Sequence, residues 1–251
     1  MDDLKRYEEL VKTIEYHNDC YYNQDDPKIS DYEYDMMMKE LKKIEKDHPE
    51  FVTPNSPTQH VGGSAKREAG VLVRHRVPML SLQDVFSKEE VQEFVESMQE
   101  TLVDPVFVVE YKIDGLSMAL RYENGLLTTA ITRGDGIIQG EDVTVNAKVI
   151  KDVKNKLKEP IEYLEVRGEV YMTNEAFDKV NEIQELNNKK TFANPRNCAA
   201  GTLRQLDSRI TKQRNLSMFI FNIQDIRGKE ITSHSQGYEY LKKQGMKVID
   251  N

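Results

Sequence analysis

Lys112 is the side chain in this sequence that is best suited to covalent chemistry. It stands in the run Glu110–Gly115, Glu-Tyr-Lys-Ile-Asp-Gly, and an Arg-Gly-Asp-Gly run begins 21 residues later at Arg133. A free lysine has a pKa of about 10.4, so an attacking amine must first lose its proton. The carboxylates of Glu110 and Asp114 alone raise that pKa, so a nucleophilic Lys112 needs desolvation or nearby cations. An ion-paired lysine is the alternative interpretation.

The alternation of polar and apolar residues around Lys112 predicts a β-strand over Val106–Ile113. Successive side chains of a strand point to opposite faces of the sheet. The apolar face, which we expect to pack, consists of Phe107, Val109, Tyr111 and Ile113. The opposite face carries Glu110, Lys112 and Asp114, and we expect it to meet a ligand.

The first 52 residues predict a hairpin of two helices. Leu4–Tyr21 has helical spacing of apolar residues, and a second helix begins at Ser30, which forms a capping-box pattern with Glu33. This second helix ends before Pro49, and a Pro- and Gly-containing linker over 53–66 follows. The hairpin is too small to bury much surface by itself.

Residues 67–251 predict an α+β domain with a mostly antiparallel sheet. A helix is expected over 87–102, capped by Ser87, and a β-hairpin turns at Asn124-Gly125. Further strands are expected over 164–172 and 216–223, and further helices over 173–186 and 235–244. Arg167 and Glu169 fall on the same face of the strand over 164–172.

The composition indicates a globular protein of the cytoplasm. The chain has 251 residues with a net charge of −8, and it contains neither an apolar run of membrane-spanning length nor a signal peptide. Residues 187–214 hold seven basic and one acidic side chain, so this segment is the candidate polyanion-facing surface. Cys20 and Cys198 form no zinc pattern, and no metal ligands are predicted. The five histidines also lack metal-ligand spacing and are expected to be structural.

Three short charged motifs, one of which contains Lys112, occur in a characteristic order along the chain. Glu110–Gly115, Thr132–Gly136 and Glu165–Glu169 have the order and spacing of the covalent nucleotidyltransferases, the polynucleotide ligases and mRNA capping enzymes. Three further segments distinguish among these families: Pro78–Leu82, Asn194–Asp207 and the amino-terminal hairpin. Over essentially its whole length the chain resembles the NAD-dependent bacterial DNA ligases. The resemblance implies a helical hairpin that binds nicotinamide mononucleotide, followed by a nucleotidyltransferase (adenylation) domain.

The resemblance also implies roles for matching residues. Lys112 would attack the α-phosphate of NAD, release nicotinamide mononucleotide and carry AMP for transfer to the 5′-phosphate of nicked double-stranded DNA, with Mg²⁺ assisting. Asp114 would orient the lysine. The adenine side would be lined by Ser81, Leu82 and Glu110, the ribose and phosphate region by Arg133 and Glu169, and the phosphates of the cofactor or of DNA by Arg196 and Arg204.

The hairpin would select NAD over ATP. Asp31, Tyr34 and Asp35 share a helical face, and Tyr21 and Tyr22 lie at the end of the facing helix. Aromatic rings can stack on a pyridinium ring, and carboxylates can bind ribose hydroxyls. The alternative is that these tyrosines pack the helix interface. The family often has histidine at the position of Tyr22.

The end of the sequence predicts a truncated adenylation region. The family continues with two further active-site lysines and with downstream modules that include a zinc module. Without those lysines we expect self-adenylylation at most, slowed on the order of 10²-fold or more, and no sealing of nicks. An ATP-dependent RNA ligase or capping-type nucleotidyltransferase and a non-catalytic NAD-binding fragment are the alternatives.

Overall fold

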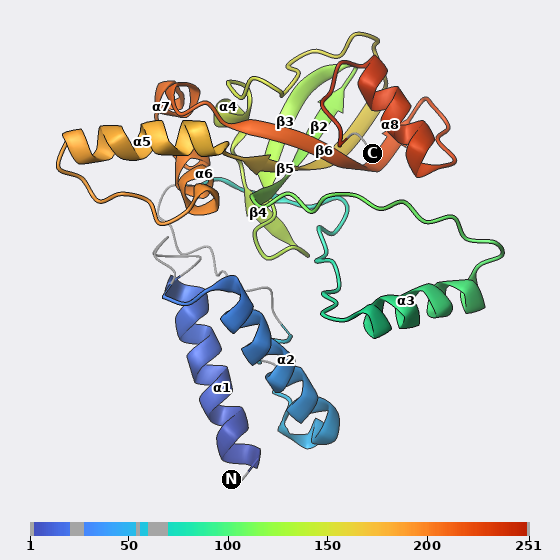
Figure 1. The fold of residues 1–251 in the computed structure, drawn as a ribbon. Coiled ribbons are helices and arrows are strands. Elements are labelled where there is room, and N and C mark those ends of the chain that lie inside the picture. Colours follow the sequence, from blue (N-terminus) through green and yellow to red (C-terminus); the bar gives the residue numbers. More distant parts are fainter. Residues whose placement is uncertain (1–2, 21–27, 54–55, 60–69, 250–251) are drawn as a thin grey trace.

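The amino-terminal part of the protein is a helical hairpin. The computed structural model describes residues 3–20, 28–53, 56–59 and 70–249. Helices α1 (Asp3–Asn18) and α2 (Asp31–Asp47) pack through a small buried core, and the 3-10 turn η2 (Pro49–Phe51) follows (Figure 1). The predicted capping box is confirmed, because Ser30 Oγ accepts from the Glu33 amide and the Glu33 carboxylate accepts from the Ser30 amide. The predicted end of the first helix at Tyr21 lies outside the described residues.

The second part is built on a four-stranded antiparallel sheet in the order β3-β2-β5-β6. Its strands are β2 (Leu116–Glu123), β3 (Leu126–Thr132), β5 (Tyr163–Tyr171) and β6 (Ser217–Arg227). Short strands β1 (Leu72–Arg74) and β4 (Gln139–Glu141) form a second antiparallel pair. Asn124 and Gly125 both have positive φ, 50° and 77°, as the predicted β2–β3 turn requires. The α+β, mostly antiparallel architecture is confirmed.

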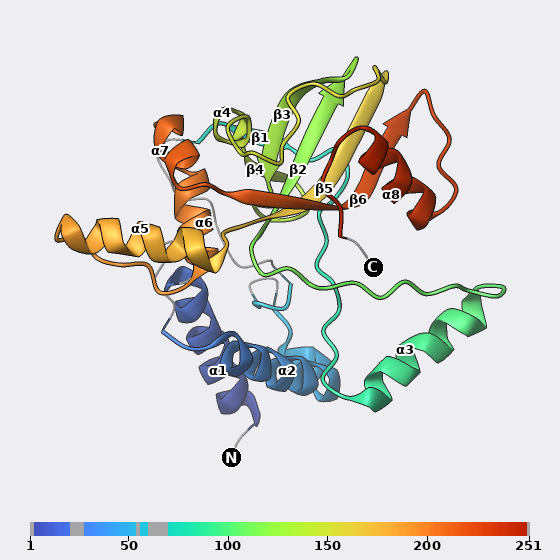
Figure 2. The ribbon, with the colours of Figure 1, turned by 45° about the horizontal axis from the view of Figure 1, so that its top comes forward.

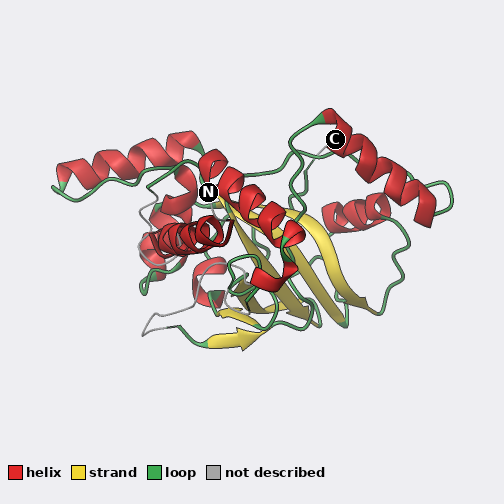
Figure 3. Ribbon diagram, turned by 90° about the horizontal axis from the view of Figure 1, so that it is seen from below, coloured by secondary structure: helices red, strands yellow, loops and turns green. Residues whose placement is uncertain are grey.

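Most helices of this part lie near the two ends of the sheet. The helices after η2 are α3 (Lys88–Thr101), α4 (Thr144–Ala147), α5 (Asn174–Leu186), α6 (Pro195–Leu203), α7 (Ser208–Gln213) and α8 (His234–Lys243). Figures 1 and 2 show α5, α6 and α7 together at one end, and α8 at the other. The view from below places α3 apart from the sheet, between long connections (Figure 3). The predicted cap Ser87 accepts a hydrogen bond from the first turn of α3, and Thr173, where the sequence predicts only the start of a helix, caps α5 in the same way.

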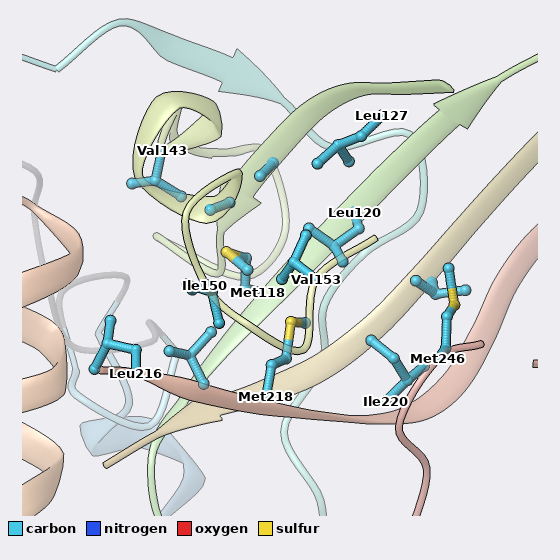
Figure 4. Packing of buried hydrophobic residues seen from close by; sticks show 14 of the residues in the cluster. Met118, Leu120, Leu127, Val143, Ile150, Val153, Leu216, Met218, Ile220 and Met246 are labelled. Carbon is cyan, nitrogen blue, oxygen red and sulfur yellow. The ribbon is translucent and has the colours of Figure 1, made fainter. Parts of the chain in front are cut away.

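One face of the four-stranded sheet is the core of this part. On β5 the residues Leu164, Val166 and Val170 are fully buried, as their alternation predicts. Methionines and aliphatic residues from β2, β6 and the C-terminal segment complete this hydrophobic core (Figure 4). The opposite face carries the charged side chains of β5, including Arg167 and Glu169. The sheet therefore separates an apolar layer from a charged one.

The segment that carries Lys112 differs from its prediction. Residues 105–114 are extended but belong to no described sheet, so the predicted strand Val106–Ile113 is wrong. Its expected packing face is also wrong in large part, because Val109 is 88% exposed and Tyr111 is 81% exposed. Phe107 only meets the edge of Phe94 on α3, at 6.3 Å between ring centroids. Alternation favours an extended backbone, but a strand ladder also needs a neighbour, and none of the described strands pairs with this segment.

In the described ranges, every helix is too short or too polar to cross a lipid bilayer. Cys20 and Cys198 are both buried and unpaired with each other. Burial raises the pKa of the Cys198 thiol to about 11, as expected of a packing residue.

Candidate active site

Lys112 is exposed and lies between two anchored carboxylates. Glu110 and Asp114 flank it, each two residues away along the chain. Glu110 Oε1 lies 2.9 Å from Nε2 of His234, the first residue of α8. Asp114 Oδ1 lies 3.6 Å from Nη1 of Arg196 on α6. Lys112 itself is exposed, so its amine is open to solvent and to a ligand.

Glu169 on β5 is the carboxyl around which the neighbouring cations converge. Removal from water raises its pKa above the ordinary range. The Ser117 hydroxyl donates to Glu169 Oε2 at 2.8 Å, and the charges of Arg196, Lys112 and Arg167 oppose the rise in pKa. The same carboxyl thus interacts with α6, with the lysine segment and with β5, which joins elements far apart in sequence into one charged site.

Gly115 allows the lysine segment to enter the sheet. A Cβ built at Gly115 would overlap the backbone carbonyl of Val170 on β5, and it would lie 3.1 Å from Glu169 Cγ. The glycine of the Lys-Ile-Asp-Gly run is therefore required by a close approach of two backbones.

Two arginines hold the segment Pro78–Leu82 against the site. Arg133 Nε donates to the carbonyl of Met79 at 3.1 Å, and its Nη2 donates to Ser81 Oγ. Arg167 Nη1 donates to the carbonyl of Leu80 at 2.8 Å, and its Nη2 lies 3.3 Å from Ser117 Oγ. Burial lowers the pKa of Arg167, and the charge of Arg133 adds to this effect. The arginines thus position backbone carbonyls beside the charged face.

The same segment presents both buried and exposed side chains. Met79 is completely buried, whereas Leu82 is 74% exposed and Ser81 is also exposed. The buried methionine anchors the segment, and its amide donates to the carbonyl of Gly136 at 2.6 Å. Ser81 and Leu82 are left accessible to a ligand.

The loop after β3 is a stable turn. Burial acts to raise the pKa of Asp135, but hydrogen bonds from the backbone amides of Ile137, Ile138 and Gln139 to its Oδ1 lower it overall. Gly134 and Gly136 have positive φ, 55° and 76°. This geometry agrees with a structural turn that places Arg133 at its first position.

Arg196 and Arg204, the two arginines of the basic segment that were assigned to phosphates, lie at different ends of α6. Asn194 caps the helix by accepting from the Asn197 amide at 2.8 Å, and Arg196 lies in the first turn beside Asp114. Arg204 follows the last turn, and its Nε donates to Glu141 of β4 at 3.0 Å. Arg196 thus joins the Lys112 site, while Arg204 extends toward the β1–β4 pair.

The hairpin residues of the predicted nicotinamide site are only partly described. Tyr21 and Tyr22 lie outside the described residues, and so does the side chain of Asp31. Tyr34 is half-buried against the hairpin core, and its hydroxyl donates to Asn18 Oδ1 at 2.7 Å. Tyr34 therefore has a packing role whether or not it also binds a ligand. Asp35, the next residue of the same helix, has an interaction partner.

A basic side chain of α2 contacts the second part of the protein. Lys39 Nζ lies 3.0 Å from Glu90 Oε1 at the start of α3, and 4.8 Å from the centroid of the Phe86 ring. The contact is solvent-exposed, so its energetic contribution is small.

Several site residues were missed by sequence reasoning. Arg167 and Ser117 were not assigned, although alternation along their strands places them on the charged face. The Arg167 guanidinium also lies 5.5 Å from the ring centroid of Phe221 on β6. His234 was expected to be structural, and its contact with Glu110 spans 124 residues, so no local signal could have identified it.

Comparison with known proteins agrees with this geometry. A family model for the NAD-dependent DNA ligase adenylation domain matches residues 70–251, and one for the DNA ligase-like, N-terminal NAD+-binding domain matches residues 1–62. The chain is 55% identical to the DNA ligase of Clostridium kluyveri over 251 residues, 53% identical to that of Caldicellulosiruptor saccharolyticus over 246, and 50% identical to that of Acetivibrio thermocellus over 249. These matches cover 100%, 97% and 99% of this chain. The chain spans 38%, 36% and 37% of the lengths of these relatives.

Proposed function

Since this chain belongs to the NAD-dependent DNA ligase family, we propose that it is an adenylation region in which Lys112 accepts AMP from NAD. The observation that carries the proposal is the position of Lys112 between two anchored carboxylates, with Glu169 and several cations converging on the same site. In a longer ligase the AMP would pass to the 5′-phosphate of nicked DNA, during replication and repair in the cytoplasm.

The proposed reaction at Lys112 is an in-line phosphoryl transfer. The lone pair of Nζ attacks the α-phosphorus of NAD, a P–N bond forms, and the P–O bond to nicotinamide mononucleotide breaks. The leaving nucleotide takes the bonding electrons, and the amine proton passes to solvent. This chemistry depends mainly on positioning and on stabilisation of charge. Arg196 is suited to stabilise the phosphate, because its contact with Asp114 holds it beside the lysine.

Mg²⁺ is expected to act with NAD. Among the described residues, no three histidine, cysteine, aspartate or glutamate side chains converge to hold a metal ion. Mg²⁺ is commonly bound through one or two carboxylates together with the phosphates of a substrate. In this protein Asp114 and Glu169 are the nearby carboxylates, and bound Mg²⁺ would neutralise phosphate charge. The roles of the protein residues do not depend on it.

The adenine side of the site is proposed to lie against Ser81, Leu82 and Glu110. Ser81 and Leu82 are exposed on a segment whose backbone is held by Arg133 and Arg167. Glu110 can accept a hydrogen bond from the exocyclic amine of adenine, because an ionised carboxylate has about four acceptor positions. Arg133 and Glu169 would then face the ribose and phosphates.

The hairpin is proposed to bind the nicotinamide half of NAD through Tyr21, Tyr22, Asp31, Tyr34 and Asp35. Support comes from the match of residues 1–62 to an N-terminal NAD+-binding domain. Aromatic stacking on the pyridinium ring and carboxylate contacts to ribose would distinguish NAD from ATP.

The basic segment around α6 and α7 is proposed to face DNA. Seven basic side chains between 187 and 214 concentrate positive charge in an acidic protein. Arg204 belongs to this segment, and its contact with Glu141 would be exchanged for a phosphate.

The test is an intact-mass measurement after incubation with Mg²⁺ and either NAD or ATP. We expect a gain of one adenylyl group with NAD only. Lys112→Ala should abolish the adduct, whereas Lys179→Ala, which removes an exposed lysine on α5, should retain it. An adduct formed only with ATP would overturn the choice of cofactor. NAD binding without any adduct would leave this chain as a nucleotide-binding module.

A further inference from the structure

The lysine segment is positioned by side chains rather than by a strand ladder. Residues 105–114 make no backbone hydrogen bond to any other described part of the protein. Phe107 meets α3, Glu110 meets α8 and Asp114 meets α6. Two residues of extended chain span only about 7 Å, so the contacts of Glu110 and Asp114 restrict where Lys112 can lie.

His234 is itself held on a well-anchored helix. Ser233 caps α8 by accepting from the Gln236 amide at 3.2 Å. The His234 ring lies 4.3 Å from the ring of Tyr238, one turn along the helix, at an angle of 49°. Tyr238 is buried, and its hydroxyl lies 3.3 Å from the carbonyl of Phe221 on β6. The imidazole that contacts Glu110 is therefore fixed relative to the sheet.

Glu110 also interacts with Tyr238. Burial raises the pKa of the Tyr238 hydroxyl, and the nearby charge of Glu110 raises it further. His234 contacts the carboxylate, and Tyr238, one turn along the same helix, packs against the His234 ring. The hydrogen bond from the imidazole gives the carboxylate a defined orientation, which a flexible glutamate on an exposed segment otherwise lacks.

We propose that His234, supported by Tyr238, is a positioning residue that orients Glu110 toward adenine and thereby restricts the position of Lys112. The imidazole donates from Nε2 to Oε1 of Glu110, which leaves acceptor capacity for the exocyclic amine of the base. The inference rests on the proposed function of Lys112 and Glu110. It adds that the specificity for the base depends on α8, 124 residues away in sequence.

The test compares NAD with its hypoxanthine analogue, which has no exocyclic amine on the base. Single-turnover adduct formation followed by intact mass gives a maximal rate and a half-saturating concentration for each dinucleotide. Wild type should prefer NAD. His234→Ala should lower the preference about tenfold, as expected when a hydrogen bond to a charged group loses its orientation. His234→Gln, whose amide can still donate, should keep most of the preference.

The control variant is Glu239→Ala, which removes an exposed side chain of the same helix and should leave both parameters unchanged. Urea unfolding of each variant monitors the fold. If His234→Ala slows both dinucleotides equally, His234 is merely structural and the inference is wrong. If wild type binds NAD but forms no adduct, the proposed chemistry fails. The ratio of the two dissociation constants, measured by calorimetry, then still decides whether His234 orients Glu110.

Discussion

The buried ion pair between Arg121 and Glu165 should control the stability of the sheet. The two residues lie directly opposite each other on β2 and β5, and their side chains are 7% and 0% exposed. Arg121 Nε donates to Glu165 Oε2 at 2.9 Å, and the Tyr163 hydroxyl donates to the same oxygen. Arg121 Nη2 also donates to the carbonyl of Arg74 at 3.0 Å, which ties β1 to the sheet.

Replacement of Arg121 by methionine keeps most of the side-chain volume but leaves the Glu165 carboxylate buried beside a single remaining donor, Tyr163. Loss of one partner of a buried pair typically costs about 3–5 kcal/mol. In the double variant Arg121→Met, Glu165→Met no buried charge remains, so much of this cost is removed. The Arg74 carbonyl loses its donor in both variants, so the double variant adds only the loss of an acceptor for the Tyr163 hydroxyl, about 1–3 kcal/mol.

Urea unfolding followed by far-ultraviolet circular dichroism measures these differences in the free energy of unfolding. The expected order of stability is wild type, then the double variant, then Arg121→Met. Arg209→Met serves as a control, because Arg209 pairs with Asp207 at the surface and is 86% exposed. The expected loss of unfolding free energy in Arg121→Met is at least about 3 kcal/mol, so a loss below about 1 kcal/mol would refute the reasoning. So would a double variant less stable than the single one.

Two further predictions concern the site. Gly115→Ala places a Cβ against the Val170 carbonyl, so we expect a loss of about 1–3 kcal/mol of stability and a larger loss of adduct formation, measured by urea unfolding and intact mass. Partial burial raises the pKa of the Glu169 carboxyl above its ordinary 4.5, so ionisation of this carboxyl destabilises the folded state. The destabilisation is absent below pH 4.5, and it grows as the pH rises toward the raised pKa. Glu169→Gln should therefore raise the urea midpoint at pH 7, leave it nearly unchanged at pH 4 and slow adduct formation; a midpoint gain that is the same at both pH values would contradict this.

Local sequence patterns were sufficient for the elements whose signals lie within a few residues. The caps at Ser30, Ser87 and Thr173 each depend on a backbone amide three residues away, and the Asn124-Gly125 turn depends on positive φ at two neighbours. The buried face of β5 followed from alternation because apolar residues must be removed from water on one side.

Identification of the site required both the sequence motifs and the tertiary structure. The sequence motifs identified Lys112, Asp114, Glu169 and Arg196, which the structure brings to one region, but Tyr21 and Tyr22 remain predictions. Sequence reasoning assigned Lys112 to a strand, and it lies instead on an extended segment without a ladder. Alternation describes one chain segment, whereas a ladder depends on whether another segment lies beside it.

By itself, the sequence indicated candidate residues for the chemistry, the helices and turns that have local signals, and the family that the chain resembles. Only the tertiary structure decided that His234 holds Glu110 and that two arginines hold Met79, Leu80 and Ser81. It also decided that the Glu169 carboxyl is partly removed from water. The physical reason is distance along the chain. Caps and turns are completed by residues within a few positions, whereas these contacts and this desolvation come from groups about 50 to 120 positions apart, whose meeting depends on the packed fold.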